Sequence, residues 1–174
     1  MAFLLNPGDI INMLYFAYGM NTNQESMAMR CPKAKYLGNY TLYKFLLQFR
    51  RVADIDFTGN KKDKVIGTIW DISKDCEKSL DILEGFPTFY EKQYIKTKKG
   101  KMMFYIMTPR NKTRLETPSQ YYYKMLYDGY RQHKITTHQL ISSYNRADDY
   151  EKLIEKDYQY GWSFNPPIKI IKRR

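Results

Sequence analysis

Cysteine and histidine are scarce in this chain of 174 residues, which contains two of each. Cys31 and Cys76 lie far apart and form no CxxC pattern, so the sequence argues against a disulfide framework and against a zinc site. Cys31 precedes Pro32 and has no partner nearby in the sequence. This context favours a structural thiol over a catalytic nucleophile.

The two histidines, His133 and His138, are five residues apart in a polar segment. Because a metal pair on one helix face needs a spacing of three or four residues, we expect both histidines at the surface. The motifs GxSxG, GxxxxGK[ST], HExxH and GxGxxG are also missing. The sequence therefore predicts neither a metal nor a cofactor.

Long apolar runs are missing as well, and none reaches the length that spans a membrane. Residues 1–13 are interrupted by Asn6-Pro7-Gly8-Asp9 and lack a basic start, which argues against a signal peptide. The expectation is a cytoplasmic protein without membrane attachment.

Acidic residues are outnumbered, with 18 Asp and Glu against 29 Lys and Arg, and the net charge is +11. Such an excess favours solubility, or attraction to anions such as nucleotides and acidic metabolites. No zinc-finger, basic-helix or RNP signature is present, which argues against nucleic-acid binding. The length and the 43% apolar content suit a single domain with a core.

Strand-forming and helix-forming segments do not alternate regularly as in βαβ units, and this order predicts an α+β fold. The sequence predicts strands over 14–18, within 36–49 with breaks, and over 65–70, 90–97 and 101–108, the last two joined by a turn. It predicts helices over 23–30, 73–84, 118–129, 136–144 and 147–156. A polar loop is expected over 54–63, and extended segments over 1–13 and 157–174.

Residues 1–144 are expected to form one domain, with residues 145–174 as a C-terminal helix and basic tail packed on it. Gly67, inside the strand 65–70, suggests a bend or a close approach of backbone.

The stretch Leu14–Asn23 combines an aromatic strand, a glycine and the start of a helix. Gly19 permits a positive φ and a close approach to a ligand. Free N–H groups at such a turn suit an anion. Strand–glycine–helix turns are common and most bind nothing, so the turn alone does not establish a site.

Glu84 is expected to be the last helical residue before the terminator Gly85. The negative end of the helix dipole and the apolar loop that follows both disfavour the charged carboxylate, so both raise its pKa. A raised pKa suits a general base, although an exposed Glu that merely ends a helix is the alternative. Asp81, three residues earlier on the same face, could assist Glu84, repel it or simply be solvated.

Tyrosine is abundant, with 17 residues. Tyr18, Tyr90, Tyr105 and Tyr122 each lie at the end of an element or in a strand, where a phenol can point into a pocket. The alternative for each of them is an aromatic core residue with a polar tip.

Several motifs keep their order from residue 14 to residue 129, about two thirds of the chain. They are Tyr15-Phe16-Ala17-Tyr18-Gly19-Met20-Asn21, Arg30-Cys31-Pro32-Lys33-Ala34 with Gly38, Val65-Ile66-Gly67-Thr68-Ile69-Trp70, Leu80-Asp81-Ile82-Leu83-Glu84-Gly85 with Tyr90, Tyr105-Ile106-Met107, and Pro118-Ser119-Gln120-Tyr121-Tyr122 with Gly129. Together they resemble the γ-glutamylcyclotransferase-like family, which includes AIG2-like and γ-glutamylamine cyclotransferase proteins.

The resemblance implies a small mixed β-barrel with flanking helices, and an enzyme that needs no metal or cofactor. Glu84 would take a proton from the α-ammonium of a γ-glutamyl substrate, and the amine would attack its own γ-carbonyl. Backbone N–H groups from Gly19 to Asn21 would hold a substrate oxygen. The products would be 5-oxoproline and an amino acid or amine. The implied substrate-binding residues are Tyr18, Gly19, Met20, Asn21, Tyr90, Tyr105 and Tyr122.

Met20 stands where the family usually has serine, and neither the +11 charge nor the basic tail is needed for a zwitterionic substrate. Two alternatives to an enzyme therefore stay open. One is a protein on the same scaffold that binds or sequesters an anionic ligand, such as a nucleotide or metabolite. The other is a structural or partner-binding protein that uses the Tyr-rich tail after Asp157.

Overall fold

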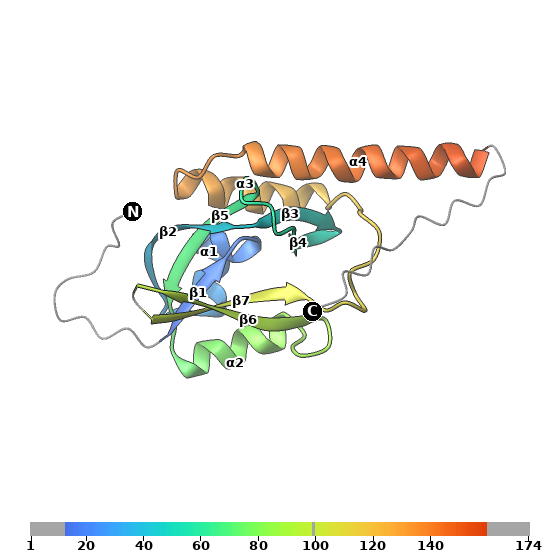
Figure 1. Ribbon diagram of the computed structural model, residues 1–174. Helices are drawn as coiled ribbons and strands as arrows, with labels where there is room; N and C mark the ends of the chain where they lie inside the picture. Colours follow the sequence, from blue (N-terminus) through green and yellow to red (C-terminus); the bar gives the residue numbers. More distant parts are fainter. Residues whose placement is uncertain (1–12, 99, 160–174) are drawn as a thin grey trace.

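The computed structural model describes residues 13–98 and 100–159 (Figure 1). The described chain forms strands, helices and one 3-10 helix in the following order: β1 (Leu14–Ala17), η1 (Met20–Thr22), α1 (Gln24–Arg30), β2 (Lys35–Tyr43), β3 (Phe45–Arg50), β4 (Val52–Phe57), β5 (Lys64–Asp71), α2 (Lys74–Leu83), β6 (Tyr90–Thr97), β7 (Gly100–Met107), α3 (Gln120–Gln132) and α4 (His138–Gln159).

Five strands form one mixed sheet in the order β2-β5-β1-β7-β6. The central strand β1 pairs antiparallel with β5 and parallel with β7. This arrangement confirms the predicted α+β class. The expected barrel does not close, because the chain turns at Lys44 (φ 69°) and β3 pairs with β4 in a separate two-stranded sheet.

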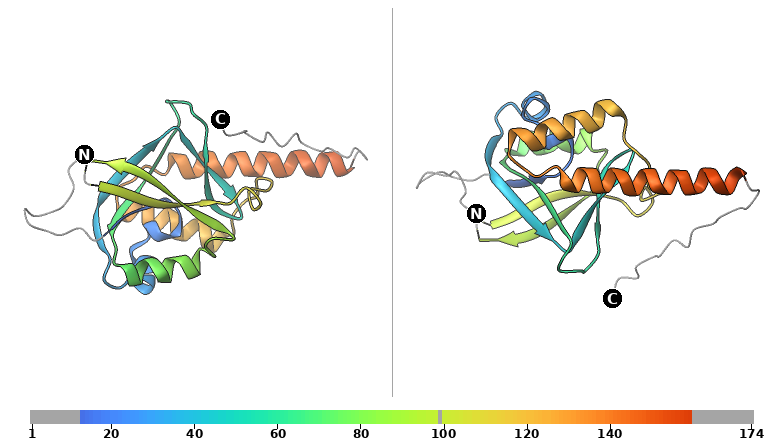
Figure 2. Two further views of the ribbon diagram at one scale, coloured as in Figure 1. Left: turned by 60° about the horizontal axis from the view of Figure 1, so that its bottom comes forward. Right: turned by 90° about the horizontal axis from the view of Figure 1, so that it is seen from above.

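The sheet separates two apolar cores, as alternation along a strand requires. In β1, Leu14 and Phe16 belong to the core that α3 and α4 cover, whereas Tyr15 and Ala17 belong to the core that α2 covers. Figure 1 shows α3 and α4 on one side of the sheet and α2 on the other. The two views in Figure 2 show α4 alongside α3. Glu84 directly follows α2, and β1 leads into Gly19, so the placement of α2 against the sheet determines where the site forms.

Gly67 allows β1 and β5 to pack closely. A Cβ atom at this position would lie 2.2 Å from the carbonyl oxygen of Ala17 and 2.7 Å from the ring of Phe16. No real Cβ tolerates such distances, so the close approach expected at Gly67 is confirmed.

The polar loop predicted over 54–63 is wrong at its beginning, because β4 continues to Phe57. Asp54 is fully buried and accepts hydrogen bonds from the backbone N–H of Met107, from Arg50 and from Lys112, at 2.9, 2.9 and 2.7 Å. Buried charges are tolerated when they are paired and hydrogen-bonded. Two of these partners, the Met107 N–H and Lys112, are 53 and 58 residues away in the sequence, so the local polarity does not indicate the burial of Asp54.

The C-terminal helices also differ from the prediction. One continuous helix, α4, replaces the two predicted over 136–144 and 147–156, and it passes through the proposed division at residue 144. Arg146, between those two helices, bonds the Leu47 carbonyl oxygen and Gln48 of β3, which holds this segment in the helix. Residues 157–159 are helical rather than extended, and α3 continues three residues past Gly129. The rest of the tail and residues 1–12 lie outside the described residues.

Cys31 and Cys76 form a disulfide, contrary to the free structural thiol expected at Cys31. The bridge joins the residue after α1 to α2 across 45 residues, and the two Cα atoms are 5.2 Å apart. Sequence separation says little about distance once antiparallel strands return the chain, as β2 and β5 do here. None of the described helices is long and apolar enough to cross a membrane.

His133 is buried, contrary to the expected surface position, whereas His138 is exposed as predicted. The ring of His133 lies 4.2 Å from the ring of Tyr36 and 5.9 Å from that of Trp70, between centroids, and its burial lowers its pKa. Within residues 13–98 and 100–159, no group of three or more His, Cys, Asp or Glu side chains could hold a metal ion.

The disulfide leads to a prediction about stability. Replacing both cysteines, Cys31→Ala with Cys76→Ala, should lower the free energy of unfolding by about 2–4 kcal/mol, because the bridge restricts the unfolded chain. Urea unfolding followed by circular dichroism measures this change. Reductant should destabilise the unsubstituted protein and leave the double variant unaffected. Equal stability of the unsubstituted protein with and without reductant would contradict the bridge.

Candidate active site

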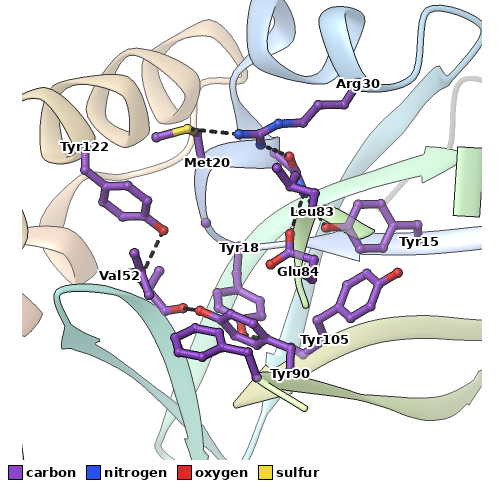
Figure 3. Close-up of a pocket in the computed structure, with 14 residues that line it drawn as sticks. Tyr15, Tyr18, Met20, Arg30, Val52, Leu83, Glu84, Tyr90, Tyr105 and Tyr122 are labelled. Carbon is purple, nitrogen blue, oxygen red and sulfur yellow. Dashed lines mark hydrogen bonds between the residues drawn. The ribbon is translucent and has the colours of Figure 1, made fainter. Parts of the chain in front are cut away.

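A pocket of about 300 Å³ opens between the turn after β1, the end of α2, the start of β4, β6 and α3 (Figure 3). All eight residues that the sequence predicted for the site line this one pocket: Tyr18, Gly19, Met20, Asn21, Glu84, Tyr90, Tyr105 and Tyr122. Six further lining residues were not predicted: Tyr15, Arg30, Val52, Ala53, Leu83 and Phe89.

The turn after β1 forms one wall of the pocket. Gly19 has φ −103°, so the positive φ that glycine permits is not used here. A Cβ atom at this position would lie 3.4 Å from both the Cβ of Ala53 and the hydroxyl oxygen of Tyr122. Glycine therefore keeps open the space between these residues at the pocket wall.

The 3-10 helix η1 follows directly. It is closed by hydrogen bonds from the N–H of Thr22 to the carbonyl of Gly19 and from the N–H of Asn23 to the carbonyl of Met20, both at 3.0 Å. Neither bond uses the N–H of Gly19 or Asn21, as is usual for the first residues of a helix. Asn23 then caps α1 by accepting from two backbone N–H groups, which fixes the turn against that helix.

Asn21 connects the turn to Glu84. Its side chain is buried, and its Nδ2 donates to the Tyr15 hydroxyl at 2.9 Å and to Glu84 Oε1 at 3.1 Å. Its Oδ1 accepts from Arg30 (Figure 3). Both amide N–H groups are thereby used inside the protein. The side chain of Asn21 orients Glu84, and its backbone N–H is the group that can face a ligand.

Glu84 follows the last residue of α2 as its C-cap and is half-buried. Burial raises its pKa to about 7, against the opposing effects of the Arg30 charge and the hydrogen bond from Asn21. The direction agrees with the expectation from the sequence. Gly85 terminates the helix with φ 61° as predicted, but the last helical residue is Leu83 rather than Glu84. A carboxyl group with this pKa can take up and release a proton near neutral pH.

Arg30 brings a positive charge to the pocket. Its guanidinium donates to Asn21 Oδ1 and to the sulfur of Met20, the latter at 3.3 Å. Among the residues that the structure describes, no carboxylate forms an ion pair with Arg30. Its charge is therefore available to an anionic group in the pocket. Its place in the Arg-x-Pro motif was a sequence signal that could have identified it.

Three of the predicted tyrosines use their hydroxyl protons within the protein. Tyr18 donates to the carbonyl of Tyr105 at 2.8 Å, Tyr90 to the carbonyl of Ala53 at 2.6 Å, and Tyr105 to Asp81 Oδ1 at 2.6 Å. Burial raises the pKa of all three, so the phenols stay protonated. They shape the pocket with their rings and do not offer protons to it.

Two other tyrosines accept hydrogen bonds. The Tyr122 hydroxyl accepts from the N–H of Ala53 at 3.0 Å, and the Tyr15 hydroxyl accepts from Asn21. Burial raises the pKa of both. Since these oxygens serve as acceptors within the described chain, their own O–H groups can be directed at a ligand. The sequence analysis selected Tyr122 but not Tyr15.

Asp81 does not line the pocket, although it shares a helix face with Glu84. It accepts from Tyr105 and from Lys92, the latter at 2.8 Å, and Lys92 also pairs with Glu77. Of the three roles left open for Asp81, simple solvation is therefore excluded. The carboxylate holds the ring of Tyr105 against the pocket.

Comparison with known proteins places the chain in a family. Residues 15–124 match the family described as gamma-glutamyl cyclotransferase, AIG2-like, and the chain belongs to this family. The family is described by its γ-glutamyl cyclotransferases, and this chain is of the general cyclotransferase-like kind. The search of curated protein sequences gave no match.

Two solved structures have a similar fold. One is an uncharacterized protein from Homo sapiens (loc79017), with 27% identity, a TM-score of 0.61, and 75% of this chain and 85% of that chain covered. The other is a gamma-glutamyl cyclotransferase, with 23% identity, a TM-score of 0.59, and 83% of this chain and 98% of that chain covered. At 23% identity, the similarity to the second structure shows only that the fold is shared.

The geometry around Glu84 predicts how its carboxyl group titrates. In the unsubstituted protein its pKa should be about 7, measured from the carboxyl ¹³C chemical shift. Arg30→Met should raise this pKa, because the guanidinium favours the ionised carboxylate. Lys33→Met removes an exposed positive charge outside the pocket and is the matched control, for which no change is expected. Equal values in Arg30→Met and Lys33→Met would contradict this role of Arg30.

Proposed function

We propose that this chain is a γ-glutamyl cyclotransferase in which Glu84 is the general base. The observation that carries the proposal is the 3.1 Å hydrogen bond from Asn21 to Glu84, which joins two segments 63 residues apart in the sequence. It holds a carboxyl group with a pKa of about 7 against a turn whose two closing hydrogen bonds leave out the N–H groups of Gly19 and Asn21. A proton acceptor and donors for an oxygen thus face the same pocket.

The reaction would proceed by intramolecular attack. The Glu84 carboxylate takes a proton from the substrate's α-ammonium, and the freed amine attacks the γ-carbonyl carbon. The bond from that carbon to the leaving nitrogen then breaks, and the leaving nitrogen receives the protons lost by the α-nitrogen, with Glu84 as carrier. The products are 5-oxoproline and an amino acid or amine. Because nucleophile and electrophile belong to one molecule, orientation supplies much of the acceleration.

The other pocket groups fit the charges of this reaction. The N–H groups of the turn from Gly19 to Asn21 would bind the oxyanion that develops on the γ-carbonyl. Arg30 would face the α-carboxylate of the substrate. In this scheme the turn acts through its backbone, and Met20 in place of the usual serine is accommodated because its sulfur contacts Arg30.

The charges in the pocket disfavour the anion-binding alternative. Among the described residues, Arg30 is the only Lys or Arg that lines the pocket, and the carboxyl of Glu84 lies in the same pocket. The phosphates of a nucleotide carry several negative charges and call for more positive charge than this. A γ-glutamyl compound, with both an ammonium and a carboxylate, fits better. A partner-binding role of the tail and a cytoplasmic location stay predictions.

Removing the base tests the proposal. Glu84→Gln should lower the rate of 5-oxoproline release from γ-glutamyl amino acids or γ-glutamyl amines by at least about 100-fold, as expected for loss of a general base. Chromatographic detection of 5-oxoproline measures this rate. Glu25→Gln, at an exposed position of α1 outside the pocket, is the matched control and should keep full activity.

Two outcomes would contradict the proposal in different ways. If Glu84→Gln keeps its activity, Glu84 is not the general base, although the protein is still a cyclotransferase. No 5-oxoproline from any γ-glutamyl compound, together with a thermal shift on adding a phosphate-bearing ligand, would favour the anion-binding protein instead.

The pKa of Glu84 predicts the pH dependence. Only the deprotonated carboxylate accepts a proton. On the acidic side of the pH profile, kcat/KM should therefore fall about tenfold per pH unit below about pH 7, and the effect of Glu84 should disappear above this pH. Initial rates of 5-oxoproline release between pH 5 and pH 8 measure the profile. Full activity at pH 5 would show that the base has an ordinary carboxyl pKa, and would contradict the role of burial.

A further inference from the structure

The mouth of the pocket differs in chemistry from its floor. Asn21 and Glu84 form a polar floor, and Asn21 is almost completely buried. Three apolar side chains, those of Val52, Leu83 and Phe89, also line the pocket, and we call them the apolar rim. Leu83 and Phe89 are 47% and 41% exposed, so two large apolar side chains stand partly in water at the entrance.

The exposure at the rim is part of a local concentration of apolar surface. Ile82 and Phe86, in the same short segment but outside the pocket lining, are 84% and 38% exposed. Contiguous exposed apolar residues mark surfaces that bind something. Leu83 and Phe89 differ from Ile82 and Phe86 because they face the cavity that holds Glu84.

We propose, resting on the proposed function, that the preferred substrate has a leaving amine with an apolar side chain, which lies against the apolar rim. The glutamyl half of any such substrate carries an ammonium and a carboxylate. The only charged side chains that line the pocket within the described chain are those of Glu84 and Arg30. The glutamyl half therefore belongs on the floor, and the leaving half points toward the mouth.

The rim then selects by burial and desolvation. An apolar side chain that leaves water against Val52, Leu83 and Phe89 stabilises the complex in proportion to the area buried. A charged side chain in the same place would lose hydration without gaining a partner. With a volume of about 300 Å³, the pocket lies at the lower end of the range for ligand sites, so the leaving group reaches the rim.

A matched panel of substrates tests the inference. γ-Glutamyl-L-leucine should show a kcat/KM about 10- to 100-fold higher than γ-glutamyl-L-glutamate, in the range that an apolar pocket can discriminate. γ-Glutamyl-3-methylbutylamide has the side chain of the leucine compound but no leaving-group carboxylate. Comparing the two distinguishes an amino acid from a simple amine as the source of the apolar group.

Substitutions in and beside the apolar rim test whether the rim causes the preference for an apolar leaving group. Leu83→Ser should lower the ratio of kcat/KM for γ-glutamyl-L-leucine to that for γ-glutamyl-L-glutamate by about three- to tenfold, through loss of apolar contact. Val52→Thr keeps the shape of the side chain and should lower the ratio in the same direction. Ile82→Ser removes the neighbouring, more exposed side chain outside the pocket and should leave the ratio unchanged.

The outcomes are distinguishable. If 5-oxoproline is released at equal rates from the leucine and glutamate compounds, the inference is overturned while the proposed function stands. If Leu83→Ser lowers both rates but leaves their ratio unchanged, Leu83 serves to position Glu84 and does not select the substrate. This result would also overturn the inference. If no γ-glutamyl compound yields 5-oxoproline, the proposed function fails and the inference fails with it.

Discussion

The hydrogen bond between Asn21 and Glu84 is the contact on which the pocket depends. It joins the turn after the central strand to the end of α2, two elements brought together by the sheet rather than by sequence. The amide of Asn21 also binds Tyr15 and Arg30, so its orientation is fixed on every side. A short polar side chain thereby holds a carboxyl group, a phenol and a guanidinium in one arrangement.

Two opposing effects set the proton affinity of Glu84. Burial favours the neutral acid, whereas Arg30 and Asn21 favour the carboxylate, and the balance leaves the pKa at about 7. The disulfide between Cys31 and Cys76 joins the two helices that end at Arg30 and next to Glu84. The disulfide therefore connects the helix that carries Arg30 to the helix that precedes Glu84.

Local features of the chain could be predicted from the sequence, and features that depend on distant partners could not. The strand before Gly19, the helix that ends next to Glu84 and the 90–107 hairpin follow from periodicity and terminators. The burial of Asp54 depends on Lys112 and the Met107 N–H, which are 58 and 53 residues away in the sequence, and no local pattern indicates these partners. The residues at the pocket mouth, such as Leu83, had no sequence signal, because the exposure of one apolar residue is decided by packing.

In the proposed reaction, Glu84 and the turn from Gly19 to Asn21 act on two reacting groups of one substrate, Glu84 on the α-nitrogen and the turn on the γ-carbonyl oxygen. The most direct measurement is a crystal structure of this protein with 5-oxoproline bound. We expect the lactam carbonyl oxygen to lie about 2.9 Å from backbone N–H groups of the turn, with the lactam nitrogen facing the Glu84 carboxyl group. A product molecule bound elsewhere, or bound in the pocket with its lactam nitrogen turned away from Glu84, would contradict it.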